Sequence, residues 1–169
     1  AGNETKSWTF VSGPPGGVAT IANPSLLTTD VSVNIYGSYV FNLTFSSGSC
    51  PITPPQPVTI NFFQPATSTP EPDKTVCVDG NVLPAPIASF PVTGTVGGGA
   101  SGGRWEIAAG SGTFVSSGAA VGSVIAAGVI NDNYIPSAAD FAAGTVTLRL
   151  VGVHPQAVCG NVSNTVVIT

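Results

Sequence analysis

Short runs in which apolar and polar residues alternate are the feature that most limits how this chain can fold. In the run 39–45, Tyr, Phe or Leu occupies every odd position, and Val, Asn or Thr occupies the even ones. The run 146–150 alternates in the same way. A period of two is that of a β-strand with one buried face, and the 21 Gly and 15 Pro supply turns between such runs. The sequence therefore predicts an all-β fold of antiparallel strands arranged as a sandwich.

One short helix is expected between two of these runs. Ser137 can cap its first turn, and Asp140, three residues later, can reach back to complete a capping box. Gly144 can end the helix. Phe141 is expected to plug the end of the sandwich as a core residue.

The charge and hydropathy of the chain exclude several classes of function. Charged residues make up 7% of the chain, the net charge is −4, and there are only four Lys and Arg. Nucleic acids and anionic membrane surfaces both require clustered positive charge, so neither is an expected partner. The most apolar stretch, 119–130, is interrupted by two glycines and is shorter than the ~20 residues of a membrane span. We expect no membrane insertion of this segment.

The same order of features occurs twice along the chain. Each copy has a tryptophan strand, a strand led by glycine, a cysteine and a closing strand. The first copy consists of Trp8, the run 37–45, Cys50 and the run 57–62, and the second of Trp105, the run 144–150, Cys159 and the run 164–169. Such self-similarity marks a repeat array. We expect two tandem modules, 1–65 and 75–169, joined by a Pro-rich linker, 66–74.

The two copies differ in what precedes the tryptophan. The second has room for about a pair of strands between Val76 and Gly103, whereas seven residues precede Trp8. We therefore expect the first module to lack its opening strands, which would leave an open sheet edge. Methionine is absent, so Ala1 is not an initiator and the chain is expected to be part of a longer protein.

Three cysteines leave one without a partner. Cys77 opens the second module and Cys159 precedes its last strand, and first and last strands of a sandwich can lie close together. The sequence predicts a Cys77–Cys159 disulfide, with Cys50 unpaired because its partner would lie in the missing strands. The alternative is three free thiols.

Several motifs resemble the repeats of gliding-motility cell-surface adhesins of the SprB type from Bacteroidetes. In the second module these are Trp105, 112–114, 134–140, 144–148 and 163–166. In the first, which is similar to the PKD-like domains of the same proteins, they are Trp8, 12–14, 37–41 and 48–50. The resemblance implies two tandem immunoglobulin-like (PKD-like) antiparallel β-sandwich modules, the first N-terminally incomplete.

The resemblance also implies a function. Such proteins are secreted by the type IX route and displayed at the cell surface, attached to the outer membrane through other parts of the full protein. The chain would then be a stalk and adhesion surface that contacts neighbouring repeats and an extracellular surface or polysaccharide, and it would not be an enzyme. Two alternatives stay open: an accessory module of a large secreted enzyme, and a discrete glycan-binding module.

The aromatic residues have two interpretations. Trp8 and Trp105 are candidates for sugar stacking, but they occupy equivalent positions in the two copies, which favours a place in the core. Tyr39 and Phe41 are also expected in the core, because they share the apolar face of their strand.

Polar candidates for chemistry are few. His154, the only histidine, is expected in a solvated loop, because no nucleophile or orienting group is evident for it. The oxygen ligands at 131–133 and 79–81 suit calcium, the only metal considered. Asx turns explain both clusters better, so no cofactor and no metal ligand are assigned.

Overall fold

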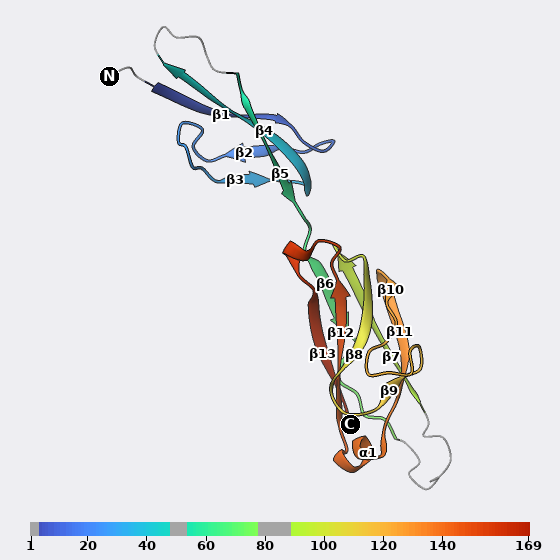
Figure 1. Cartoon of the computed structure of the whole chain (residues 1–169). Coiled ribbons are helices and arrows are strands. Elements are labelled where there is room, and N and C mark those ends of the chain that lie inside the picture. Colours follow the sequence, from blue (N-terminus) through green and yellow to red (C-terminus); the bar gives the residue numbers. More distant parts are fainter. Residues whose placement is uncertain (1–3, 48–53, 78–88) are drawn as a thin grey trace. The chain divides into compact units, whose positions relative to one another are not determined.

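The computed structural model describes residues 4–47, 54–77 and 89–169, which form two compact units, Ala1–Gln64 (unit 1) and Pro65–Thr169 (unit 2) (Figure 1). Both units consist almost entirely of antiparallel strands, so the predicted all-β fold is confirmed. Cys50 and the candidate calcium ligands at 79–81 lie outside the described residues.

Unit 2 is a sandwich of two four-stranded sheets. One has the order β6 (Ala66–Pro70), β7 (Phe90–Gly98), β11 (Gly128–Ile135) and β9 (Thr113–Phe114). The other has the order β10 (Ile125–Ala126), β8 (Gly102–Ala109), β12 (Val146–Val153) and β13 (Val162–Ile168). By their place in the sheets, β6, β7, β11 and β9 stand where strands A, B, E and D of an immunoglobulin domain stand, and β8, β12 and β13 stand where C, F and G stand. β10 adds a short edge strand beside β8 and follows β9 in the chain.

The core of unit 2 lies between these sheets. Alternation explains it, because every second residue is buried from Phe90 to Val96 in β7, from Ile130 to Tyr134 in β11 and from Val146 to Gly152 in β12. Twelve buried residues form one cluster: Phe90, Val92, Val96, Trp105, Phe114, Ile130, Tyr134, Val146, Leu148, Leu150, Val166 and Ile168. Trp105 lies on strand C, where immunoglobulin domains carry a buried tryptophan.

Two short helices connect strands of unit 2. The predicted capping box is present at α1 (Ala138–Ala143): the Asp140 amide donates to the Ser137 hydroxyl, and the Asp140 carboxylate accepts from the Ser137 amide. Gly144 ends the helix with a φ of 70°, a conformation that glycine adopts without strain. The 3₁₀ helix η1 (Ala157–Cys159) precedes β13.

The expected linker is a wrong prediction. Residues Ala66–Pro70 form β6, which pairs with β7 from Ala66 opposite Gly98 to Pro70 opposite Gly94. β6 contains Pro70, which an edge strand tolerates because one of its sides needs no donor. After β6, Lys74 runs parallel to Ile168 at the edge of β13.

Unit 1 is built from a three-stranded sheet and a two-stranded one. The first has the order β1 (Glu4–Ser12), β4 (Gly37–Ser47) and β5 (Gln56–Phe62), and the second joins β2 (Ala19–Ile21) to β3 (Val31–Val33). Hydrogen bonds join the three-stranded sheet to the segments on either side of β3: the Trp8 indole donates to the Leu26 carbonyl, and the Tyr39 hydroxyl donates to the Ile35 carbonyl.

The repeat seen in the sequence extends to strand register. The opposed pairs are Trp8–Leu43, Phe10–Phe41 and Ser12–Val40 in unit 1, and Trp105–Leu150, Ile107–Leu148 and Ala109–Thr147 in unit 2. Each tryptophan strand carries one extra residue at the same step, a shared β-bulge. The sheet β1-β4-β5 therefore corresponds to β8-β12-β13, position by position.

The predicted Cys77–Cys159 disulfide is also wrong, because both cysteines are free and exposed. The segment at Val76 does lie beside the last strand, but it pairs with the far end: the Val76 amide donates to the Thr169 carbonyl. Cys159 precedes the near end of β13, which is seven residues long. At about 3.3 Å per residue the strand separates the two thiols by far more than a disulfide spans.

Candidate functional site

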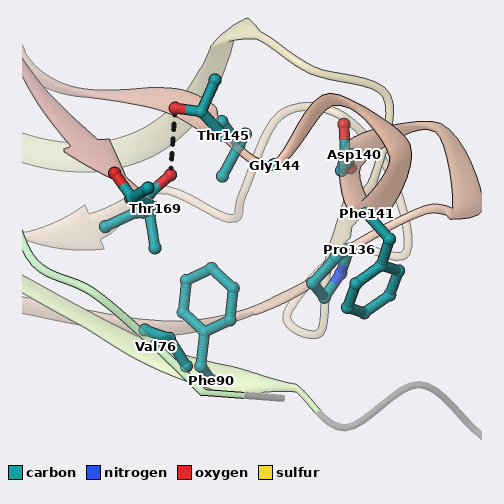
Figure 2. Close-up of a pocket in the computed structure, with 10 residues that line it drawn as sticks. Val76, Phe90, Pro136, Asp140, Phe141, Gly144, Thr145 and Thr169 are labelled. Atoms are coloured by element: carbon teal, nitrogen blue, oxygen red, sulfur yellow. Dashed lines mark hydrogen bonds between the residues drawn. The ribbon is translucent and has the colours of Figure 1, made fainter. Parts of the chain in front are cut away.

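The aromatic residues singled out from the sequence lie in different environments. Trp105 is completely buried, and its indole donates to the Ile130 carbonyl at 3.2 Å. Tyr39 and Phe41 are buried in unit 1, where Trp8 is only half-buried. Phe141 is 39% exposed, so its assignment to the core is wrong. It lies beside Pro136 and borders a recess that the core residues Phe90, Val146 and Ile168 also line (Figure 2).

His154 is not the solvated loop residue expected from the sequence. It is 8% exposed and lies directly after β12. Its Nδ1 accepts from the Gln156 amide at 3.0 Å, while its own amide donates to Asn161 Oδ1. Both bonds lie within the loop between β12 and β13, and the first holds the imidazole ring against that loop. The histidine therefore has a structural environment.

The cluster at 131–133 belongs to strand β11 and is not an Asx turn. Both carboxylate oxygens of Asp132 are engaged: Oδ1 accepts from the amides of Ser116 and Asn133, and Oδ2 accepts from the Ser116 hydroxyl at 2.5 Å. Within the described ranges no group of three or more His, Cys, Asp and Glu side chains could hold a metal ion. Asp132 ties the chain after β9 to β11.

Asp140 is the centre of a buried polar network that the capping box only partly revealed. Its Oδ2 accepts from the Tyr134 hydroxyl at 2.8 Å and from the Ser137 amide at 2.9 Å, and its Oδ1 accepts from the Ser111 amide at 2.8 Å. Burial raises the pKa of Asp140, but these bonds together outweigh it and leave that pKa lowered. Burial, with the bond to Asp140, raises the pKa of Tyr134.

Gly112 is required beside this network. Its amide donates to the Tyr134 hydroxyl at 2.9 Å. A Cβ at this position would lie 2.2 Å from the Ile135 carbonyl oxygen and 2.5 Å from the tyrosine oxygen. Only a residue without a side chain allows this approach, which accounts for the glycine in the motif 110–114.

A second polar cluster, which the sequence did not reveal, is an ion triad on β8 and β12. Glu106 Oε1 accepts from Arg104 Nε at 2.8 Å, and Oε2 accepts from Arg149 Nε at 2.7 Å. Burial raises the pKa of Glu106, but the bonds to Arg149 and Arg104 exceed this effect and leave the pKa lowered. Glu106 and Arg149 meet because they stand opposite each other where β8 pairs with β12. Both arginines of the chain belong to this triad.

The lowered pKa values predict how unit 2 responds to acid. Glu106 and Asp140 both titrate below their usual ranges when folded. Their stabilisation is therefore complete above the unfolded pKa values of about 4 and is lost as the pH falls through the folded ones. We expect the Tm of unit 2 to fall between roughly pH 5 and pH 2. Calorimetry across that range measures the slope.

The variant Glu106→Gln serves as the control for this prediction. It keeps the shape of the side chain but removes one of the two titrating carboxyls, so its Tm at pH 7 is lower and its further loss in acid is smaller. An equal acid slope in the variant and the natural chain would show that Glu106 does not titrate as proposed.

Figure 2 shows a recess at the end of unit 2 that contains α1. Its volume is about 170 Å³, and apolar side chains dominate its lining: Val76, Phe90, Pro136, Phe141, Val146 and Ile168. The one acid at its wall, Asp140, has its oxygens committed to the network described above. The Thr145 hydroxyl donates to the Ile168 carbonyl at 3.2 Å. The recess suits an apolar side chain.

One segment of unit 2 carries most of its large exposed apolar residues. The uncharged segment between Glu106 and Asp132 contains five large ones: Val115, Val121, Val124, Ile125 and Val129. Elsewhere in the described part of unit 2 only Phe141, Val158 and Val167 are large, apolar and exposed. We call residues 115–129 the apolar edge, since they run from β9 through the edge strand β10 into β11. A contiguous patch of exposed apolar residues is the usual mark of an interaction surface.

Comparisons with known proteins give little beyond architecture. No protein family and no curated protein matches the sequence. In the described residues, no helix is long and apolar enough to cross a membrane. Among solved structures, the D00-D0 domain of intimin is similar at 11% identity and a TM-score of 0.36, covering 91% of this chain and 78% of that one. Human CDH23 EC21-23 is similar at 16% identity and a TM-score of 0.39, covering 97% and 50%. At these scores neither likeness bears on function.

Proposed function

We propose that this chain is a two-module segment of a large extracellular adhesin, in which the modules act as a stalk and expose an adhesion surface. The observation that carries the proposal is the repeat: in two units of one chain, the sheets β1-β4-β5 and β8-β12-β13 share strand order, register and a β-bulge. Repetition of a module extends a chain without adding a reaction, which suits a stalk. The motifs shared with SprB-type repeats support surface display, type IX secretion and gliding as the setting.

The apolar edge is the proposed adhesion surface. Val124 and Val129 are 60% and 61% exposed, and no charged residue lies within the segment. Covering an uncharged apolar surface with another weakly hydrated surface lowers the free energy by roughly 25 cal/mol per Å² of buried area. The partner would be an extracellular surface or polysaccharide, reached without the help of charge.

We expect Val124→Asp combined with Val129→Asp to weaken adhesion at least about tenfold, because each covered valine contributes roughly 1 kcal/mol and the new carboxylates must also be desolvated. Beads coated with the chain are allowed to settle on polystyrene and on polysaccharide films, and their retention under flow is measured. Val158→Asp is the matched control, since Val158 is exposed but lies in η1, away from the edge. Equal retention of all three proteins would contradict this surface.

The setting in a cell needs its own test. An antibody to the chain should label intact cells, and on a gliding cell the labelled spots should move along its length. Labelling only after the cells are opened would refute surface display, whereas immobile surface spots would refute gliding and leave adhesion standing.

The alternative function is an accessory or glycan-binding module of a large secreted enzyme. The half-buried Trp8 favours it, because a partly exposed indole can stack on a sugar. A glycan array separates the two: binding to one defined glycan that Trp8→Ala abolishes supports a lectin-like module, whereas broad adhesion that depends on the apolar edge supports the adhesin.

A further inference from the structure

The two units differ in what covers the inner face of the three-stranded sheet. In unit 2, β7 pairs with β11 from Gly128 to Tyr134, and β6 pairs with the far side of β7. β6 also bonds to the opposite sheet: the Ser68 hydroxyl donates to the Leu150 carbonyl at 2.7 Å, and Asn164 Nδ2 donates to the Ser68 carbonyl. The pair β6-β7 thus closes one side of the sandwich.

Among the described residues, unit 1 has a counterpart of β11 but none of the neighbouring strand β7. β3 corresponds to the second half of β11, because each pairs with the short strand that follows the tryptophan strand, β2 and β9 respectively. In both units the tryptophan indole also donates to a carbonyl of this region, Leu26 or Ile130. Yet β3 pairs with β2 alone among the described strands. Its other edge corresponds to the edge that binds β7 in unit 2.

The exposure of equivalent residues shows the consequence. Val58 in β5 stands opposite Phe41, as Val166 in β13 stands opposite Leu148. Val58 is 37% exposed, whereas Val166 is completely buried. On the same inner face, the described part of unit 1 leaves Phe10 and Phe45 exposed. The inner face of unit 1 is therefore an apolar surface of which β2-β3 covers only part.

We propose that this open side of unit 1, formed by the free edge of β3 and the inner face of β4 and β5, is a docking site for a pair of β-strands of the β6-β7 kind. The β7-like strand of the occupant pairs with β3 through backbone hydrogen bonds, and its β6-like strand covers Leu43 and Val58. In unit 2 the equivalent pair precedes the tryptophan strand in the chain. The repeat order therefore makes the occupant a segment of the same polypeptide that lies ahead of β1.

The structure of β7 defines the chemistry of the occupant. Phe90, Val92 and Val96 alternate inward, so the occupant carries apolar residues at every second position. Gly94 interrupts them because a Cβ there would lie 2.6 Å from Leu150 Cδ2. Leu43 occupies the position of Leu150 in unit 1. A glycine opposite Leu43 is therefore expected in the docked strand.

The test supplies such a segment in register. A second copy of residues 65–101, with its Cys77 changed to Ser, is fused in front of Thr5 of the chain. The distance from the fused strands to Trp8 then equals the distance from β7 to Trp105. A control fusion carries Val92→Asp and Val96→Asp in the added copy only. Amide hydrogen exchange is measured by mass spectrometry for β3 and β5, in both fusions and in the natural chain, and sedimentation velocity gives their oligomeric states.

We expect the fusion to remain monomeric and to slow exchange in β3 and β5 at least about tenfold, since paired and covered amides open only with their unit. The control fusion should exchange like the natural chain. The proposal is overturned if the fusion leaves β3 unprotected, if the control protects equally, or if β3 of the natural chain already exchanges as slowly as β11. Protection that rises with concentration of the natural chain, together with dimer formation, would identify a second copy as the occupant and also overturn it.

Discussion

Replacing Trp105 with alanine is expected to lower the free energy of unfolding of unit 2 by about 3–5 kcal/mol, because a large, completely buried side chain leaves a cavity that the sheets cannot close. The Ile130 carbonyl also loses its indole donor. For a unit of this size the loss lowers the Tm by roughly 15 °C. Amide hydrogen exchange, measured for each unit at increasing denaturant concentration, separates the unfolding of unit 2 from that of unit 1.

Trp8→Ala is the matched control that the repeat provides. Trp8 occupies the same register position and also donates to a carbonyl, but its side chain is only half-buried. Its loss should destabilise unit 1 by about 1–2 kcal/mol, since less apolar area leaves the solvent on folding. Equal losses for the two variants would contradict the difference in packing between the units.

The second large effect is expected for Asp140→Ala, which should destabilise unit 2 by about 3 kcal/mol. The variant removes an ionised acceptor from the Tyr134 hydroxyl and from the amides of Ser111 and Ser137, and buried donors without a partner cost about 1–3 kcal/mol each. It also removes half of the capping box at α1. Urea unfolding monitored by circular dichroism measures the change.

Tyr134→Phe distinguishes this network from a simple loss of packing. It keeps the ring, which packs against Phe90 and Phe114, and removes only the hydroxyl. The bonds to Asp140 and from Gly112 are lost, so a smaller effect of about 1–2 kcal/mol is expected. If Asp140→Ala cost no more than Tyr134→Phe, the carboxylate would not be the centre of the network.

Local signals in the sequence predicted the local structure well. The run 146–150 alternates and forms the first five residues of β12, where Val146, Leu148 and Leu150 are buried. The spacing from Ser137 to Asp140 predicted a capping box, and the box is present. Each of these features depends on residues no more than a few positions apart, so the chain itself carries the information.

Features that depend on how distant segments meet were predicted poorly. Prolines at 65, 70 and 72 indicated a linker, but β7 offers its free edge to Ala66–Pro70 and turns that segment into a strand. The expected Cys77–Cys159 disulfide is wrong because Val76 pairs with Thr169, whereas Cys159 precedes the opposite end of the last strand. Sequence alone does not tell a parallel neighbour from an antiparallel one. The Glu106 triad depends on the pairing of β8 with β12, which no local pattern reveals.

By itself the sequence determined the all-β character of this protein, its division into two repeats and the inner face of the runs 39–45 and 146–150, because alternation, turn residues and self-similarity are properties of neighbouring positions. Only the tertiary structure decided the strand order, the separation of Cys77 from Cys159 and the burial of His154. It also decided that Val58 is exposed where Val166 is buried. These properties depend on which strands lie across a sheet or a core from one another, and that choice is made by packing over long sequence separations.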